Sequence, residues 1–457
     1  MRTVFAIMPF GIQASHRNRR LKIDFDSIYK KAIQPACIEM GLQIIRADEE
    51  ITGGIIHTLM FERLVCSDIA IVDMSNQNAN VCYELGFRHC ARENHTIIIF
   101  DKDSKLPFDF SFERAIPYEL NSGELSDENA QILKEEIKKR LVKINESDSV
   151  KDSPAFELIE DFPRTELCEA RLNIYKKKQA NYEKVIQDIK NASCKEEIDL
   201  CFNNIKEHGL SIKSLAFYII ENFKERKEWS NIIEFINNVL FIEGIKDVYY
   251  KQQLALAYNK RGDGTDRMLA KDVIEESLLK DGKSSETYGI LGSIYKSLYE
   301  AESNPKAKNS YLSLSIQAYR EGFNSDITDY YPGINLATLL FKKYAITQQE
   351  SLINKMEKVL GVVEYDLLLH SDENDYWYLA TLYEIEVLYK RFSVLSEIIN
   401  KICLLDIQNK IQPWQKESTL KNLTYIKNIY SKNCIDTDWY NEFKDKLSLK
   451  GVEYVLD

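Results

Sequence analysis

The chain has 457 residues, of which 44% are hydrophobic and 29% are charged, and it carries a formal net charge of -11. This length predicts two to four domains with packed cores, and the acidic balance argues against general nucleic-acid binding. The apolar runs are far shorter than a membrane-spanning helix. The N-terminal stretch is too short for a signal peptide, and we expect it to begin the first strand directly. Nine cysteines without a C-x-x-C pair indicate free thiols in a reducing compartment, so we expect a cytoplasmic protein that spans no membrane.

Strand-like and helix-like segments alternate in the first third of the chain. The expected strands cover residues 3–8, 42–46, 69–73, 96–100 and 114–120, and the expected helices cover residues 25–40, 51–66, 81–92 and 127–144. Pro35 must start a new turn or kink the first of these helices. The last one has an apolar stripe formed by Ile132, Leu133, Ile137, Leu141 and Ile144. The alternation predicts an α/β domain over residues 1–145, with a doubly wound parallel sheet of the flavodoxin-like kind.

The rest of the chain has almost no strand signal. Residues 146–164 are acidic and contain proline and serine, so we interpret them as a linker. Amphipathic segments then recur at 252–259, 267–280, 287–300, 311–322 and 333–344. Like helices are spaced by thirty to fifty residues, as in stacked helical hairpins. We therefore expect residues 165–457 to form a tetratricopeptide-like helical solenoid.

A polar loop follows the apolar run 69–72 and leads into the helix at 81–92. Asp73 ends the strand, and Asn78 and Asn80 are both candidates for the N-cap of the helix. Glu84 then lies one turn into the helix. Open α/β sheets bind ligands at the carboxyl ends of their strands, and a helix N-terminus offers free N–H groups there. The pattern predicts a ligand site with Glu84 beside it.

Simpler interpretations of these residues remain open. Glu84 and Arg88 are four residues apart, so they can form an exposed ion pair on the helix. Asp73, Asn78 and Asn80 can serve only as turn and cap residues. The histidines lack the spacing of metal ligands, so we expect no metal site.

Four motifs in residues 3–120 resemble the nucleoside 2-deoxyribosyltransferase-like superfamily, which is related in fold to TIR domains. They are VFAIMPF (4–10), RAD (46–48), SDIAIVD (67–73) and NVCYELG (80–86). The resemblance implies that Glu84 is the nucleophile that attacks the anomeric carbon and that Asp73 helps to hold the base. The transferases carry an aspartate six residues before the nucleophile, where this chain has Asn78. The remaining expected substrate contacts are Phe10, Asp48, Ser75, Asn80 and Tyr83.

The chemistry of N-glycosidic cleavage explains why a carboxylate such as that of Glu84 is needed. Positive charge builds on the ribose ring, and a carboxylate beneath the anomeric carbon stabilises or attacks it. Nicotinamide in NAD is already cationic and leaves without an acid. A neutral base needs a proton donor, and Asp73 fits that role if its pKa is raised. Phe10 and Tyr83 would exclude water.

Five motifs in residues 150–440 are similar to the TRAFs-binding, tetratricopeptide-like region of apoptosis signal-regulating kinases and its bacterial relatives. They are NKRGD (259–263), ETYGILGSIYK (286–296), YYPGINLAT (330–338), WYLAT (377–381) and PWQKEST (413–419). No kinase motifs accompany them. The combined resemblance implies a bacterial defence or stress-signalling protein in which a helical region controls a nucleotide-processing effector.

Two hypotheses follow from the sequence. In the first, residues 1–145 hydrolyse a nucleotide, with NAD or a related nucleoside as substrate and not as a resident cofactor. The helical region regulates this activity through a ligand or protein partner. Lys260, Arg261 and Lys296 either supply positive charge for an anionic signal or an acidic partner, or are ordinary solvated residues at helix ends. The chain can also act as a homo-oligomer. In the alternative, the protein is a non-catalytic scaffold that binds a nucleotide or another protein.

Overall fold

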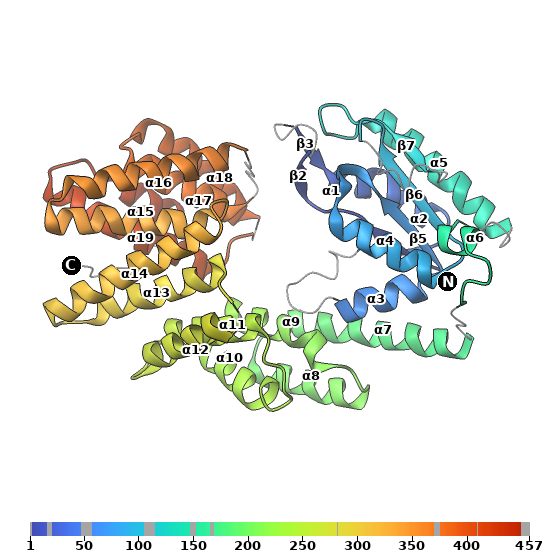
Figure 1. The fold of residues 1–457 in the computed structure, drawn as a ribbon, viewed down its shortest axis with the longest axis horizontal. Helices are drawn as coiled ribbons and strands as arrows, with labels where there is room; N and C mark the ends of the chain where they lie inside the picture. Colours follow the sequence, from blue (N-terminus) through green and yellow to red (C-terminus); the bar gives the residue numbers. More distant parts are fainter. Residues whose placement is uncertain are drawn as a thin grey trace. The chain divides into compact units, whose positions relative to one another are not determined.

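The computed structural model describes residues 2–15, 21–46, 57–104, 115–146, 152–164, 169–280, 282–369, 375–408 and 410–448. They form two compact units, Met1–Tyr218 and Ile219–Asp457, and each unit is considered by itself (Figure 1). Within the described ranges, no helix has the length and apolar character needed to cross a membrane.

The first unit contains a parallel sheet of five strands in the order β4-β1-β5-β6-β7. The strands are β1 (Thr3–Ile7), β4 (Gln43–Arg46), β5 (Ile69–Asp73), β6 (Thr96–Asp101) and β7 (Ile116–Tyr118). This topology confirms the predicted doubly wound sheet. The chain moves from β1 outward to β4 and then returns to β5 on the other side of β1. The strand order therefore reverses between β1 and β5, the position where such sheets bind ligands.

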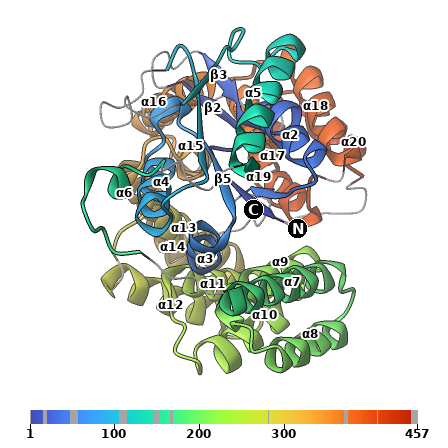
Figure 2. The same ribbon diagram turned by 90° about the vertical axis from the view of Figure 1, so that its right-hand side faces the viewer.

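Helices cover both faces of the sheet because alternate strand residues point to opposite sides (Figure 2). Val4 and Ala6 belong to one apolar core, whereas Phe5 and Ile7 belong to the other. The first core is covered by α1 (Phe25–Ile28), η1 (Tyr29–Ile33), α2 (Gln34–Glu39) and α5 (Asp127–Glu146). The second is covered by α3 (His57–Cys66) and α4 (Ala79–Ala91).

Pro35 starts a new turn, one of the two predicted alternatives: it lies in the first turn of α2, after a wide π turn closed where the N–H of Gln34 donates to the carbonyl of Tyr29. Two other local features differ from the sequence-based expectations. Ile132 was expected on the apolar stripe of α5, but it is 58% exposed because one helical step rotates it about 100° from buried Leu133. The antiparallel pair β2 (Ile12–Ala14) and β3 (Lys22–Asp24) was not predicted.

Part of the segment interpreted as a linker is anchored on the first unit. The backbone N–H of Thr96 donates to Oδ2 of Asp152 at 2.9 Å, and Oγ of Ser153 donates to the carbonyl of His89 at 2.6 Å. Ser153 is completely buried and precedes α6 (Pro154–Leu158). These bonds fix residues 152–158 beside α4 and β6.

The helix α7 (Glu169–Asn191) lies along α3 in the same unit. Arg63 on α3 pairs with Glu183 at 3.3 Å, and Lys178 pairs with Glu62 at 3.5 Å. The chain then continues through α8 (Lys195–Glu207) and α9 (Ile212–Glu225).

The second unit is a stack of helical hairpins. Its elements are α10 (Trp229–Phe235), η5 (Ile236–Leu240), α11 (Val248–Arg261), α12 (Asp266–Lys280), α13 (Ser285–Ala301), α14 (Pro305–Ser325), α15 (Tyr330–Thr347), α16 (Glu350–Leu369), α17 (Tyr376–Leu388), η6 (Phe392–Val394), α18 (Leu395–Ile407), α19 (Pro413–Lys432) and α20 (Asp438–Lys446). Hairpins form between α11 and α12, α13 and α14, α15 and α16, and α17 and α18. The arrangement confirms the predicted solenoid.

The first helices of these hairpins form one layer. Helices α11, α13, α15 and α17 pack on one another in sequence, and α19 packs against both α15 and α17. Close packing between the hairpin partners depends on Gly292 of α13, where a Cβ atom would lie 2.8 Å from the ring of Tyr319 on α14. The layer brings residues that are up to 160 positions apart in the sequence onto a common inner face.

Candidate functional site

The loop after β5 lies at the point where the strand order reverses. Ile7 of β1 and Val72 of β5 are in register, so the segment after β1 and the loop after β5 leave the same edge of the sheet. Within this loop, Asn76 has a φ of 65° and Gln77 has a φ of 49°. Left-handed backbone at residues other than glycine is costly and concentrates at functional sites. We call the segment after β1, the loop after β5 and the first turns of α4 the crevice, because open α/β sheets bind ligands at this position.

Asp73 is completely buried in a hydrogen-bond network. Its carboxylate accepts from the N–H of Ser75 at 2.9 Å and from the hydroxyl of Tyr118 at 2.9 Å. Ser75 Oγ in turn accepts from the N–H of Asp101 at 2.7 Å. Desolvation raises the pKa of Asp73 to about 6. The structure therefore places Asp73 and Ser75 beneath the loop, where they fix its conformation.

Tyr118 was missed by the sequence-based interpretation. It lies on β7, whereas Asp73 ends β5, and the two strands are separated in the sheet by β6. Nothing in the local pattern around residue 118 marks it as a partner of Asp73, because the contact depends on the sheet order.

Glu84 lies on α4 and is half-buried. It makes no hydrogen bond or ion pair with any residue that the structure describes. Desolvation raises the pKa of its carboxyl to about 7. The alternative of an exposed ion pair with Arg88 is wrong, because Arg88 is completely buried and its Nη1 donates to the carbonyls of Leu64 and Ser67 at 2.8 and 2.9 Å.

The N-cap of α4 is Asn78. Its Oδ1 accepts from the N–H of Asn80 at 2.9 Å and from the N–H of Val81 at 3.3 Å. Of the two predicted candidates, Asn78 is therefore the cap, and Asn80 lies exposed in the first turn. The cap leaves Glu84 in the second turn, with its Cα–Cβ bond tilted toward the N-terminus of the helix.

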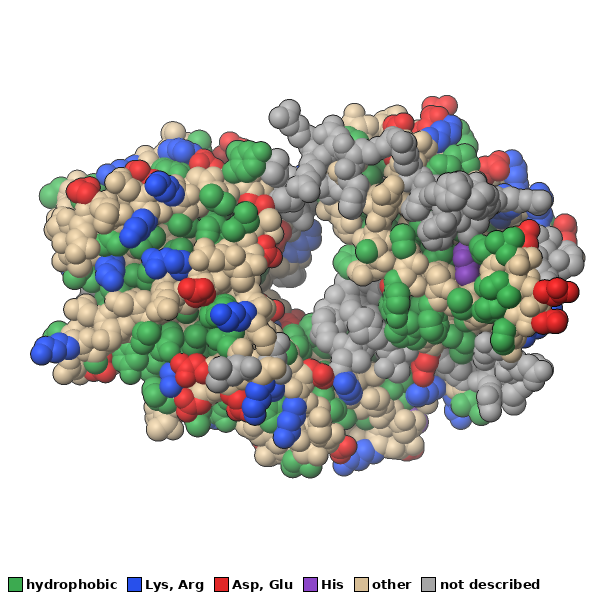
Figure 3. Space-filling model, viewed as in Figure 1, with side chains coloured by type: hydrophobic (Ala, Val, Ile, Leu, Met, Phe, Trp, Pro, Cys, Tyr) green, Lys and Arg blue, Asp and Glu red, His purple; other side chains and the backbone are tan. Residues whose placement is uncertain are grey.

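Two of the expected aromatic contacts are exposed. Phe10, in the segment after β1, is 53% exposed, and Tyr83 of α4 is 63% exposed. The ring of Tyr83 packs edge-on against Phe61 of α3, with 6.0 Å between centroids. Hydrophobic side chains gather over α4 on the face shown in Figure 3. Asp48 lies outside the described residues.

The assembled features suit reactions that use a carboxyl group. A carboxyl whose pKa lies near 7 can exchange protons near neutral pH, and its ionised form can stabilise a cation or act as a nucleophile. The described part of the chain holds no group of three or more His, Cys, Asp or Glu side chains arranged to bind a metal ion.

Comparison with known proteins places the chain in a family. Over 225 residues the chain is 28% identical to mitogen-activated protein kinase kinase kinase nsy-1 of Caenorhabditis elegans, and this match covers 45% of the chain but only 14% of that kinase. Residues 81–442 match the family model described as the MAP3K TRAFs-binding domain. The matched region begins in α4 and extends to α20. Since this model spans most of its length, the chain belongs to the MAP3K TRAFs-binding domain family.

Proposed function

We propose that the first unit cleaves the N-glycosidic bond of a nucleotide, with NAD as the first substrate to examine. The observation that carries the proposal is the carboxyl of Glu84, which is desolvated and has no partner among the described residues. A desolvated carboxyl without a partner destabilises the fold and makes no compensating contact. Residues of this kind are common at active sites. Its place near the strand-order reversal adds a reason for a ligand to bind there.

The proposed reaction begins with the ionised carboxylate of Glu84 beneath the anomeric carbon of the ribose. The C–N bond to nicotinamide breaks, and its electron pair stays on the departing nitrogen, which neutralises the pyridinium. The sugar cation is either stabilised by Glu84 or captured as an ester. Water then adds at the anomeric carbon and releases one proton. The products are nicotinamide and ADP-ribose.

Other parts of the crevice support this reaction. The network of Asp73, Ser75 and Tyr118 holds the loop rigidly beside α4, so Glu84 needs little reorganisation when the substrate binds. The resemblance to deoxyribosyltransferase-like and TIR-like domains implies the same role for Glu84, that of the nucleophile at the anomeric carbon. On the basis of this resemblance, we also propose that the protein is an effector in bacterial defence or stress signalling, controlled by its helical unit.

The test uses the full chain with NAD, deoxyinosine and deoxycytidine as separate substrates. Released nicotinamide or free base is measured by chromatography for the wild type and for Glu84→Gln. Glu128→Gln is the matched control, because Glu128 is an exposed residue of α5. We expect release by the wild type and the control but not by Glu84→Gln. Equal release by all three proteins would remove Glu84 from the reaction.

A second candidate function is protein binding by the helical unit. The family match covers this unit, and the family is described by its binding to TRAFs. We propose that the hairpin stack presents a surface for a protein partner, as solenoids commonly do. Absence of turnover on all three substrates, together with a stable complex with a purified TRAF-type protein in size-exclusion chromatography, would favour this candidate over the enzyme.

A further inference from the structure

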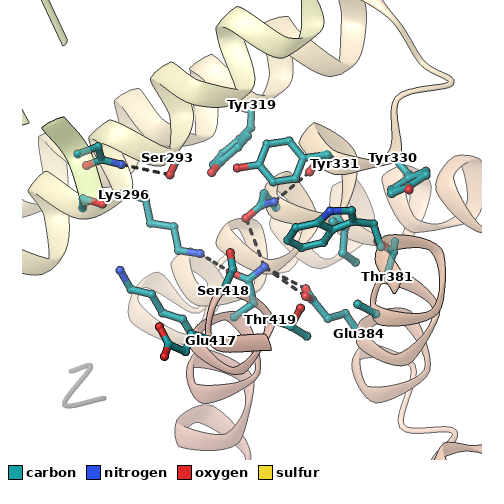
Figure 4. Close-up of a pocket in the computed structure, with 18 of the residues that line it drawn as sticks. Ser293, Lys296, Tyr319, Tyr330, Tyr331, Thr381, Glu384, Glu417, Ser418 and Thr419 are labelled. Atoms are coloured by element: carbon teal, nitrogen blue, oxygen red, sulfur yellow. Dashed lines mark hydrogen bonds between the residues drawn. The ribbon is translucent and has the colours of Figure 1, made fainter. Parts of the chain in front are cut away.

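The second unit contains a cavity of about 440 Å³ on the inner face of the hairpin stack. Its walls come from α11, α13, α15, α17 and α19, with Arg267 contributed by α12 and Tyr319 by α14. This volume is typical of sites for small organic molecules, whereas a folded partner needs a broad and shallow surface. The labelled side chains of several helices converge on this space in Figure 4.

The basic residues that line the cavity are Lys260, Arg267, Lys296 and Lys421. Lys296 of α13 is 7% exposed, and its ammonium donates to Oδ1 of Asn422 (Figure 4). Lys260 of α11 makes no hydrogen bond or ion pair with a described residue, and its ammonium lies 5.8 Å from the ring centroid of Trp414. Desolvation lowers the pKa of Lys260 and of Lys296 to about 8, although the side chain of Lys260 as a whole remains accessible.

Two carboxylates of the cavity make their direct contacts with other groups and not with these lysines. Glu417 pairs with Lys227 at 2.5 Å. Asp329 caps α15 by accepting from the N–H of Tyr331 at 3.1 Å. Each of these carboxylates already has a partner of its own.

The third carboxyl of the cavity, that of Glu384, accepts from Nδ2 of Asn422 at 3.1 Å. Desolvation raises its pKa, and the charge of Lys296 opposes that shift. Glu384 therefore offsets part of the charge of Lys296. Lys421 pairs with Glu300. Lys260, by contrast, has no ion pair with a described residue.

The cavity also presents an unused acceptor and an aromatic face. Asn259 is 7% exposed, its Nδ2 donates to Oγ of Ser293 at 3.4 Å, and its Oδ1 has no hydrogen-bond partner among the described residues. An unsatisfied buried acceptor is costly unless a ligand donates to it. The half-buried indole of Trp377 also lines the space, where it can pack on a planar ring.

We propose that this cavity binds a small phosphorylated molecule that carries a planar ring. The phosphate lies between Lys260 and Lys296, the ring packs on Trp377, and a ligand N–H or O–H group donates to Asn259. The site is separate from the crevice beside Glu84, so it does not depend on the proposed glycosidase activity. An acidic peptide would satisfy the lysines, but it would leave the aromatic wall and Asn259 unused.

The first experiment measures binding to the full chain by isothermal titration calorimetry. The probes are AMP, adenosine, inorganic phosphate and a hexaglutamate peptide. We expect AMP to bind at least tenfold more tightly than adenosine or phosphate, because only AMP carries both a phosphate and an adenine ring. Failure of AMP to bind at millimolar concentration, equal binding of AMP and phosphate, or preferential binding of the peptide would each overturn the proposal.

The second experiment uses variants of the cavity. Lys260→Gln and Trp377→Leu should each weaken AMP binding by about tenfold or more, whereas Lys358→Gln on the exposed side of α16 should not change it. We substitute Lys260 and not Lys296, because Lys296 is buried and its replacement would disturb the packing of the core more. Unchanged AMP affinity in Lys260→Gln would contradict the assignment.

The Glu84→Gln variant separates this site from the crevice. It should bind AMP at the cavity as the wild type does, even if it no longer cleaves NAD. Conversely, Lys260→Gln should lose AMP affinity whether or not the wild type has glycosidase activity. Loss of the AMP signal in Glu84→Gln alone would place the observed binding in the crevice and overturn the cavity proposal.

Discussion

The two units each withdraw ionisable groups from water, but they do so with charges of opposite sign. In the crevice of the first unit, Glu84 is a carboxyl whose pKa is raised to about 7. In the cavity of the second unit, Lys260 and Lys296 are ammonium groups whose pKa values are lowered to about 8. Desolvation is the main cause in both units, because it disfavours the charged form of either kind of group.

The sign of the charge determines which kind of group each site can stabilise. A carboxylate stabilises a cation that forms during a reaction, as the ribose ring does in N-glycosidic cleavage. Paired ammonium groups instead hold an anion that is already present in the ligand. We therefore propose a catalytic role for the crevice and a ligand-binding role for the cavity, and each of the following measurements tests that division.

The largest expected effect concerns catalysis in the crevice. Glu84→Gln retains the shape of the side chain but removes the charge that would stabilise the sugar cation. If Glu84 acts as proposed, turnover of NAD should fall by about 10³-fold or more. Initial rates of nicotinamide release at saturating NAD measure this change, with circular dichroism as the control for folding. A reduction of only a few-fold would mean that Glu84 is not the reacting carboxylate.

The next effect is the pH dependence of the same reaction. The reactive form of Glu84 is the carboxylate, and the pKa of this group is about 7. The value of kcat/KM should therefore rise about tenfold per pH unit below pH 7 and level off above it. A rate that stays constant between pH 5.5 and 8 would contradict control by Glu84.

The cavity should show the opposite dependence on pH. The pKa values of Lys260 and Lys296 lie near 8, so both lose their charge as the pH rises above that value. AMP affinity should fall by about tenfold per pH unit above pH 8 for each lysine that must be protonated. Calorimetric titrations at pH 7 and pH 9 provide the comparison, and equal affinities would exclude both lysines as phosphate ligands. The charged groups that act on these lysines are Lys227, Glu300, Glu384, Glu417 and Lys421.

A smaller effect is expected on the stability of the first unit. Tyr118→Phe removes the hydroxyl that donates to Asp73 and leaves a buried carboxyl oxygen without that donor. The loss should destabilise the fold by about 1–3 kcal/mol. Tyr83→Phe is the matched control, because Tyr83 is 63% exposed. Equal midpoints of urea unfolding for the two variants would show that the Asp73 network contributes little.

The residues of the crevice were easier to group from the sequence than those of the cavity, because the two sets are distributed differently along the chain. Asp73, Asn78 and Glu84 lie within twelve consecutive positions, so one strand–loop–helix pattern places them together. Lys260 and Lys296 were recognised as charges, but Asn259, Glu384 and Asn422 meet only when several hairpins stack. Inner faces that are built from distant helices depend on tertiary packing, which local periodicity does not encode.

The same limit applies within the α/β unit. The apolar runs of β1, β5 and β6 identified the central strands, because buried parallel strands are hydrophobic on both faces. The pair β2 and β3 was missed, since each strand has only three residues, which is too short for an alternation of apolar and polar residues to indicate a strand. Ile132 was misplaced because periodicity alone does not define the edge of a helical stripe.

The smallest expected effect is the contribution of the Glu84 carboxyl to the free energy of unfolding. Its pKa in the folded protein, about 7, lies above the ordinary value of 4.5, so the folded protein retains a proton that the unfolded chain releases. Stability from this group is present below pH 4.5 and is lost as the pH rises through 7. Glu84→Gln has no such loss, so it should be more stable than the wild type by on the order of 1 kcal/mol at pH 8 and nearly equal to it at pH 4.5. Urea unfolding at both pH values measures the difference, with Glu128→Gln as the control. A destabilised Gln variant at pH 8 would indicate that the ionised carboxylate has a stabilising partner, and Glu84 would then be a structural residue.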